Sequence, residues 1–228
     1  MSDTTEAVVA PADGDQPQPQ AASQTAYPRT EWDDYEIVPP TTSLSNEKMT
    51  MWAFLGSDCL LFGALISTYL LLRNRRPLSG EETLRAADLF DIPFTSVSSF
   101  VLLMSSLTMV LAVSTIARGE LERCKMWLLT TASLGAVFIA GQVYEFTSFY
   151  REGLGYTVSI SSSAFYTLTG FHGVHVSLGI IMLVTLWAMV KRGIIGAERA
   201  ETVEIIGLYW HFVDIVWIVI FAVVYLIP

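Results

Sequence analysis

Five long apolar runs, separated by polar segments, dominate the pattern of this chain. They cover roughly residues 50–72, 93–117, 126–149, 163–190 and 205–227. A helix needs about 20 apolar residues to cross the hydrocarbon core of a bilayer, and every run is that long. The runs are continuous, whereas the strands of a membrane barrel alternate apolar and polar residues. The pattern therefore predicts an all-α membrane protein whose residues 49–228 form a bundle of five transmembrane helices.

The N-terminal residues 1–48 differ from the rest in composition, being rich in Pro, Gln, Ala, Thr and acids. Nine acidic residues there oppose only Arg29 and Lys48. Because this segment offers too little apolar surface to offset the entropy of ordering it, we expect a disordered acidic tail. It also lacks the basic and short apolar regions of a secretory signal.

Charge excludes one class of partner and suggests an orientation. Outside the tail, thirteen acids and eleven basic residues nearly balance and form no basic stripe, which argues against nucleic-acid binding. Five spans place the two termini on opposite sides of the membrane. The side of the N-terminus holds eight of the thirteen basic residues, so the positive-inside rule favours a cytoplasmic N-terminus and an external C-terminus. The eight are Arg29, Lys48, Arg118, Arg123, Lys125, Lys191, Arg192 and Arg199.

All three histidines and three acids lie inside the apolar runs. An ionisable group in lipid costs roughly 2.5–3.5 kcal/mol on insertion scales, so each needs a partner, a water-filled cavity or a neutralising proton. The candidate site is therefore an intramembrane polar network. Its residues are Asp58, Gln142, Glu145, His172, His175, His211 and Asp214.

Matched depth suggests how these residues pair. At about 1.5 Å rise per residue, Asp58 shares a level with His211 and Asp214, and the latter two lie three residues apart on one helical face. On the other side of the membrane, Glu145 lies level with the histidines of the fourth run. We therefore expect one layer around Asp58 and a second that joins Glu145 to His172 or His175.

Two interpretations of the network remain open. Buried hydrogen bonds between spans would make all of these residues structural. Asp58 differs from the others because its own helix offers it no polar partner, which suits a residue that buffers protons. The chain shows no facing imidazoles for a haem, no thiolate cluster for a metal and no phosphate-binding loop or catalytic triad. We therefore expect no catalytic residue, no metal and no cofactor in this chain.

Small residues in two runs predict where helices approach closely; a pore lining is the alternative interpretation of the serines. The small residues are Ser96, Ser98, Ser99, Ser105, Ser106 and Ser114 in the second run, and Gly170, Gly173, Ser177 and Gly179 in the fourth.

Cys59 and Cys124 show no metal-ligand spacing and are interpreted as packing residues.

Two segments are more specific than any of these patterns: TGFHGVHVSLG at 169–179 and YWHFVDIVWIVIF at 209–221. Together with GQVYEF at 141–146 and FTSVSSFVLLMSSLTM at 94–109, they resemble subunit III of the haem-copper terminal oxidases, in its short bacterial form with five helices. FLGSDCLLFGALISTYL in the first run resembles the helix in which the family usually carries a glutamate, and Asp58 stands at that position.

The resemblance implies a subunit without metals in a hetero-oligomeric, proton-pumping oxidase of a bacterial plasma membrane. Such a subunit packs against subunit I near a proton-uptake route, has subunit II as a further partner, and binds phospholipid. Haems and copper are then expected in the partner subunits. On this basis Asp58 is the proton-buffering candidate, and the other network residues are family-type intramembrane residues.

Four functions follow from the sequence. The first is subunit III of a cytochrome c oxidase, which supports oxygen reduction to water. Quinol oxidase subunit III and a nitric-oxide-reductase accessory protein are alternatives within the same superfamily. A stand-alone transporter is the alternative from another class, although the chain shows neither inverted repeats nor broken helices.

Overall fold

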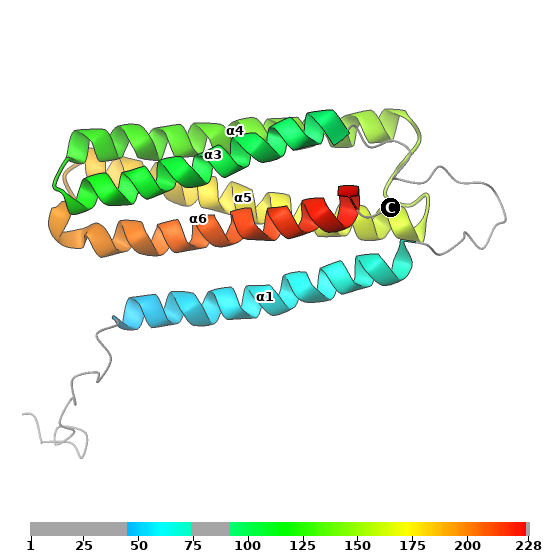
Figure 1. Cartoon of the computed structure of the whole chain (residues 1–228), viewed down its shortest axis with the longest axis horizontal. Helices are drawn as coiled ribbons and strands as arrows, with labels where there is room; N and C mark the ends of the chain where they lie inside the picture. The colour runs from blue at the N-terminus through cyan, green and yellow to red at the C-terminus, as the bar shows by residue number, and fades with distance from the viewer. Residues whose placement is uncertain (1–44, 74–91, 227–228) are drawn as a thin grey trace, which may run out of the picture. The chain divides into compact units, whose positions relative to one another are not determined.

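The computed structural model describes residues 45–73 and 92–226, and within them the five expected membrane helices are present (Figure 1). The tail at 1–44 and most of the first loop lie outside these residues. The helices are α1 Asn46–Leu72, α3 Ile92–Ala117, α4 Leu121–Arg151, α5 Ile160–Lys191 and α6 Ala200–Phe221. A short 3₁₀ helix, η1 Ala197–Arg199, precedes α6, and a π-helical turn, η2 Ala222–Leu226, extends it. All five are long and apolar enough to cross a membrane.

Capping residues set several helix ends. Ser45 accepts a hydrogen bond from the Lys48 backbone N–H at 3.2 Å, so α1 begins at Asn46 and includes three residues that the sequence had assigned to the tail. Ser159 caps α5 in the same way, accepting from the Ser162 N–H at 3.0 Å. Such caps satisfy donors that the first turn of a helix leaves unpaired.

The turn between α3 and α4 is short because a glycine closes it. Gly119 has φ +78°, a left-handed conformation that glycine adopts without a steric penalty. The Glu120 N–H then reaches back to the Thr115 carbonyl at 3.0 Å, the hydrogen bond of a Schellman motif. The chain reverses within three residues, and α3 and α4 run antiparallel in close contact (Figure 1).

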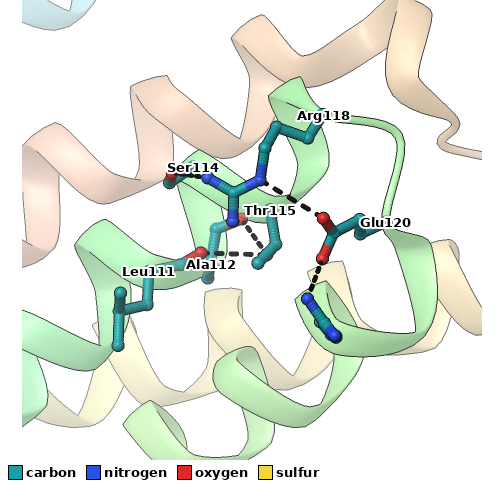
Figure 2. A network of polar contacts seen from close by, with 7 residues as sticks. Leu111, Ala112, Ser114, Thr115, Arg118 and Glu120 are labelled. Atoms are coloured by element: carbon teal, nitrogen blue, oxygen red, sulfur yellow. Dashed lines mark hydrogen bonds and ion pairs between the residues drawn. The ribbon is translucent and has the colours of Figure 1, made fainter.

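Basic residues of this turn are held by one carboxylate, as Figure 2 shows. Glu120 accepts from Arg118 at 3.3 Å and from Arg123 at 2.8 Å, and Arg118 also donates to Ser114 at 2.6 Å. Partial desolvation raises the pKa of Glu120, but Arg123 and Arg118 outweigh it and hold that pKa below its ordinary value. The ion pairs of Glu120 therefore stabilise the fold at neutral pH, and this stabilisation is lost as the pH falls through the lowered pKa of Glu120.

Four of the helices form a bundle in which α3 and α5 each contact both α4 and α6, and α1 lies against α5 and α6 (Figure 1). The buried residues of α1 form one narrow stripe: Leu55, Asp58, Phe62 and Tyr69. The rest of α1 is apolar and exposed, as at Leu60, which is 78% exposed. Such a surface suits lipid or another membrane protein as its surroundings.

Trp210 fills the centre of the bundle between two glycines. A Cβ atom on Gly135 of α4 would lie 2.6 Å from the indole of Trp210, and one on Gly179 of α5 would lie 2.9 Å from it. The two positions therefore admit only glycine as long as the indole keeps its place. Gly179 was expected at a packing face, and the structure shows it there.

Replacing Gly179 by alanine is expected to destabilise the chain by about 1–3 kcal/mol, the usual cost of overpacking a core. Gly170→Ala on the same helix is the matched control, because a Cβ at Gly170 meets no atom within 4 Å. Unfolding of both variants in detergent, followed by circular dichroism, measures the difference. Equal stabilities of the two variants would contradict the tight fit around Trp210.

Candidate functional site

Asp58 and His175 face each other between α1 and α5. His175 Nε2 lies 3.8 Å from Asp58 Oδ2, and Asp58 is only 7% exposed. The distance is longer than a hydrogen bond, and Asp58 Oδ2 has no hydrogen-bond partner among the described residues. The pair is thus an acid and an imidazole close enough to interact electrostatically inside an apolar region.

The other ring nitrogen of His175 fixes the orientation of the imidazole. Nδ1 lies 2.8 Å from the carbonyl oxygen of Phe171, and because a carbonyl only accepts, Nδ1 carries the proton. Nε2 is therefore the ring nitrogen that faces Asp58. The Tyr209 hydroxyl donates to the His175 backbone carbonyl at 3.0 Å, and the Phe62 ring lies 5.0 Å from the imidazole. Residues of α1 and α6 thus hold His175 in place.

Asp58 was expected to share a layer with His211 and Asp214, but the imidazole that faces it is that of His175. His211 Nδ1 lies 2.6 Å from the Ser106 hydroxyl of α3. Asp214 is buried, and its Oδ1 has no hydrogen-bond partner among the described residues. Helix rise gave the depth of these residues, but not the direction in which α6 presents them.

The expected link between Glu145 and a histidine of α5 is not present as a direct hydrogen bond to His172, and other partners of Glu145 are seen. Glu145 is buried and accepts hydrogen bonds from Thr95 of α3 at 2.8 Å and from Tyr225 of η2 at 3.2 Å. His172 has no hydrogen-bond partner among the described residues, and His175 turns to Asp58. Glu145 therefore connects α4 to the ends of α3 and α6.

His172 lies in an aromatic cage. Its ring stacks on Trp217 with centroids 4.9 Å apart, and Phe138 packs edge-on against it at 6.0 Å. The side chain is completely buried. Among the described residues no group of three or more His, Cys, Asp or Glu is placed to hold a metal ion. His172 thus contacts aromatic rings.

Two serine–tryptophan hydrogen bonds were not anticipated. Trp210 Nε1 donates to Ser105 at 3.0 Å, and Trp217 Nε1 donates to Ser99 at 2.9 Å. Both indoles belong to α6 and both serines to the antiparallel α3. The seven-residue spacing of the tryptophans puts them two turns apart on one face, a signal present in the sequence. Because α3 has other serines, the spacing alone could not select the two partners.

The remaining predicted residues divide between core and surface. Cys124 is buried as expected, whereas Cys59 is exposed on α1. Gln142 is 7% exposed, and both polar atoms of its amide lack a hydrogen-bond partner among the described residues. It lies on α4, toward α5, at the edge of a groove.

Comparison with known proteins agrees with this architecture. The sequence model of the family described as cytochrome c oxidase subunit III matches residues 46–227. Cytochrome c oxidase subunit 3 of Bacillus sp. (strain PS3) is 38% identical over 182 residues, which are 79% of this chain and 86% of that protein. The probable quinol oxidase subunit 3 of Staphylococcus saprophyticus is 36% identical over 180 residues, 79% of this chain and 88% of that protein. The probable quinol oxidase subunit 3 of Staphylococcus aureus (strain USA300) is 35% identical over 180 residues, which are again 79% of this chain and 88% of that protein. With its five membrane helices, the chain belongs to the subunit III family of the haem-copper oxidases.

Proposed function

We propose that this chain is the non-catalytic subunit III of a respiratory oxidase that takes electrons from cytochrome c, reduces oxygen to water and pumps protons. The observation that carries the proposal is the family match over 46–227, which includes every described helix. Relatives named for cytochrome c and for quinol are almost equally similar to the chain. The quinol oxidase subunit is therefore the second candidate.

In this proposal the chain stabilises subunit I, also contacts subunit II and binds phospholipid, while haems and copper reside in the partner subunits. The surroundings of the histidines support the proposal that haems and copper lie in the partner subunits. His172 is enclosed by aromatic rings, and His175 is engaged by a carbonyl and a carboxylate, so neither imidazole faces another across the bundle. The exposed apolar surface of α1 supports a position of the chain within the membrane.

Asp58 is the residue that we assign to proton buffering near the uptake route of subunit I. Its carboxyl is buried between helices, faces an imidazole that can accept a proton, and stands where the family usually has a glutamate. The hydrogen bonds of Glu145 and His211 and the burial of Asp214 support structural roles for these residues. The bias of basic residues supports a cytoplasmic N-terminus in a bacterial plasma membrane.

Affinity purification of the full chain from detergent-solubilised membranes tests the proposal. The purified material is expected to show haem absorbance and to consume oxygen with reduced cytochrome c. Oxygen consumption with quinol alone would establish the second candidate, and nitric oxide reduction would place the chain with a different reaction. Solute transport by the chain alone, without haem, would contradict an oxidase subunit altogether.

A further inference from the structure

A groove runs between α4 and α5 on the outside of the bundle. It has a volume of about 310 Å³, and its lining is almost entirely apolar. On α5 it is lined by Gly170, Gly173 and Ser177, which recur at one helical face. Exposed apolar side chains form its rim, including Val143 of α4 and Val174 of α5. The groove therefore opens toward the membrane.

One polar side chain lies at this groove without a partner inside the described structure. Gln142 is only 7% exposed. Its amide has a donor and an acceptor, and neither forms a hydrogen bond among the described residues. A Cβ on Gly173 would lie 4.0 Å from Gln142 Oε1, so the amide lies next to the backbone of Gly173 in the lining of the groove. Burying an amide without hydrogen bonds costs free energy. This cost points to an occupant of the groove that forms hydrogen bonds with the amide.

The depth of Gln142 selects the kind of occupant. It lies seven residues before the end of the apolar run 126–149, or about 10 Å inside that run at 1.5 Å per residue. A lipid headgroup stays at the interface, and an acyl chain has no hydrogen-bonding group. A polar side chain on a membrane-spanning helix satisfies both requirements at that depth. Small residues at 170, 173 and 177 also let a second backbone approach closely, as helix contacts in lipid require.

We propose that the groove between α4 and α5 is the seat of a transmembrane helix from a partner subunit, which presents a hydroxyl or amide side chain to Gln142. This inference rests on the proposed function, because the partner is a subunit of the same oxidase. It names the face of the chain that docks. The exposed face of α1 then remains in contact with lipid.

Gly170→Leu tests the docking by filling the groove. A Cβ at Gly170 meets no atom of the described chain within 4 Å, so the variant is expected to fold as the parent does. In the purified complex, the amount of this chain per haem is expected to fall by roughly tenfold, equivalent to about 1.4 kcal/mol. Gly63→Leu is the matched control, since Gly63 on α1 is equally unobstructed but lies outside the groove. It is expected to leave the ratio unchanged.

A second variant separates a helix from a lipid. Gln142→Leu keeps the approximate size of the side chain and removes both hydrogen-bonding groups. A partner helix is expected to bind the variant less tightly, again lowering the amount of chain per haem, whereas a groove filled by acyl chains tolerates leucine. Helical content of both full-length variants, measured by circular dichroism, confirms that they fold.

Photo-cross-linking identifies the occupant directly. A benzophenone amino acid at Val174, on the groove rim, is expected to join this chain to another oxidase subunit in the intact complex. The same group at Leu107, an exposed position on α3, is expected to give lipid adducts. Lipid adducts alone at Val174, or parental retention of Gly170→Leu, would overturn the docking face. If the unaltered chain carries no haem-bearing partner, the proposed function fails, and the docking proposal fails with it.

Discussion

Replacing Trp210 by alanine is expected to lower the free energy of unfolding of the chain in detergent by about 3 kcal/mol. Removal of a large buried aromatic side chain costs about 3–5 kcal/mol in water-soluble cores. The lower end applies because an unfolded membrane helix still has apolar surroundings, so the cavity and the lost contacts dominate. Both glycines, Gly135 and Gly179, would face an empty space, and Ser105 would lose its indole donor.

Titration with a denaturing detergent, read by circular dichroism, measures this loss. Trp52→Ala is the control of identical chemistry: Trp52 is 59% exposed on α1 and is expected to change stability by no more than about 0.5 kcal/mol. If the two variants unfolded alike, Trp210 would not be the centre of the packed bundle. The more moderate loss expected for Gly179→Ala tests the same contact from the opposite side.

The second large effect is functional. Replacing Asp58 by asparagine is expected to leave the chain in the oxidase complex but to reduce severalfold the number of turnovers before activity is lost. Asparagine has nearly the same size and can still face His175, yet it holds no exchangeable acidic proton. Asp58→Glu keeps the acid and is expected to behave as the parent. Oxygen consumption followed to exhaustion of activity measures the turnover number of each variant.

Asp214→Asn is the matched control, since it makes the same change at another buried carboxylate, on α6. It is expected to leave the turnover lifetime unchanged, because Asp214 is assigned a structural role. An unaltered lifetime in Asp58→Asn would reject proton buffering by Asp58. Loss of the chain from that variant complex would instead make Asp58 a structural residue.

The five membrane helices could be predicted because the length of each apolar run is a direct consequence of bilayer thickness. Their contacts could not. α1 and α3 are apolar nearly all round, so their sequences do not indicate which face turns inward. The rise of an ideal helix predicted the depth of the polar residues. His175 faces Asp58 and accepts a hydrogen bond from Tyr209, which lies two residues before His211. The rotation of α6, however, turns His211 toward α3.

Glu145 illustrates a second limit. Its partner Tyr225 lies in the π-helical turn η2, where the helical repeat changes, so counting residues along an ideal helix misplaces that hydroxyl. Its other partner, Thr95, is one of several hydroxyl residues in α3. The sequence shows that Glu145 needs a partner, but only the packing of three elements determines which one it finds.

The narrow buried stripe of α1 carries the carboxylate that faces His175. This helix is also joined to the bundle near both of its ends, because Lys48 pairs with Glu204 at 3.0 Å and Ser161 donates to the Arg73 carbonyl at 3.4 Å. The carboxylate and the imidazole belong to two different helices, so the distance between them is set by how α1 packs on α5.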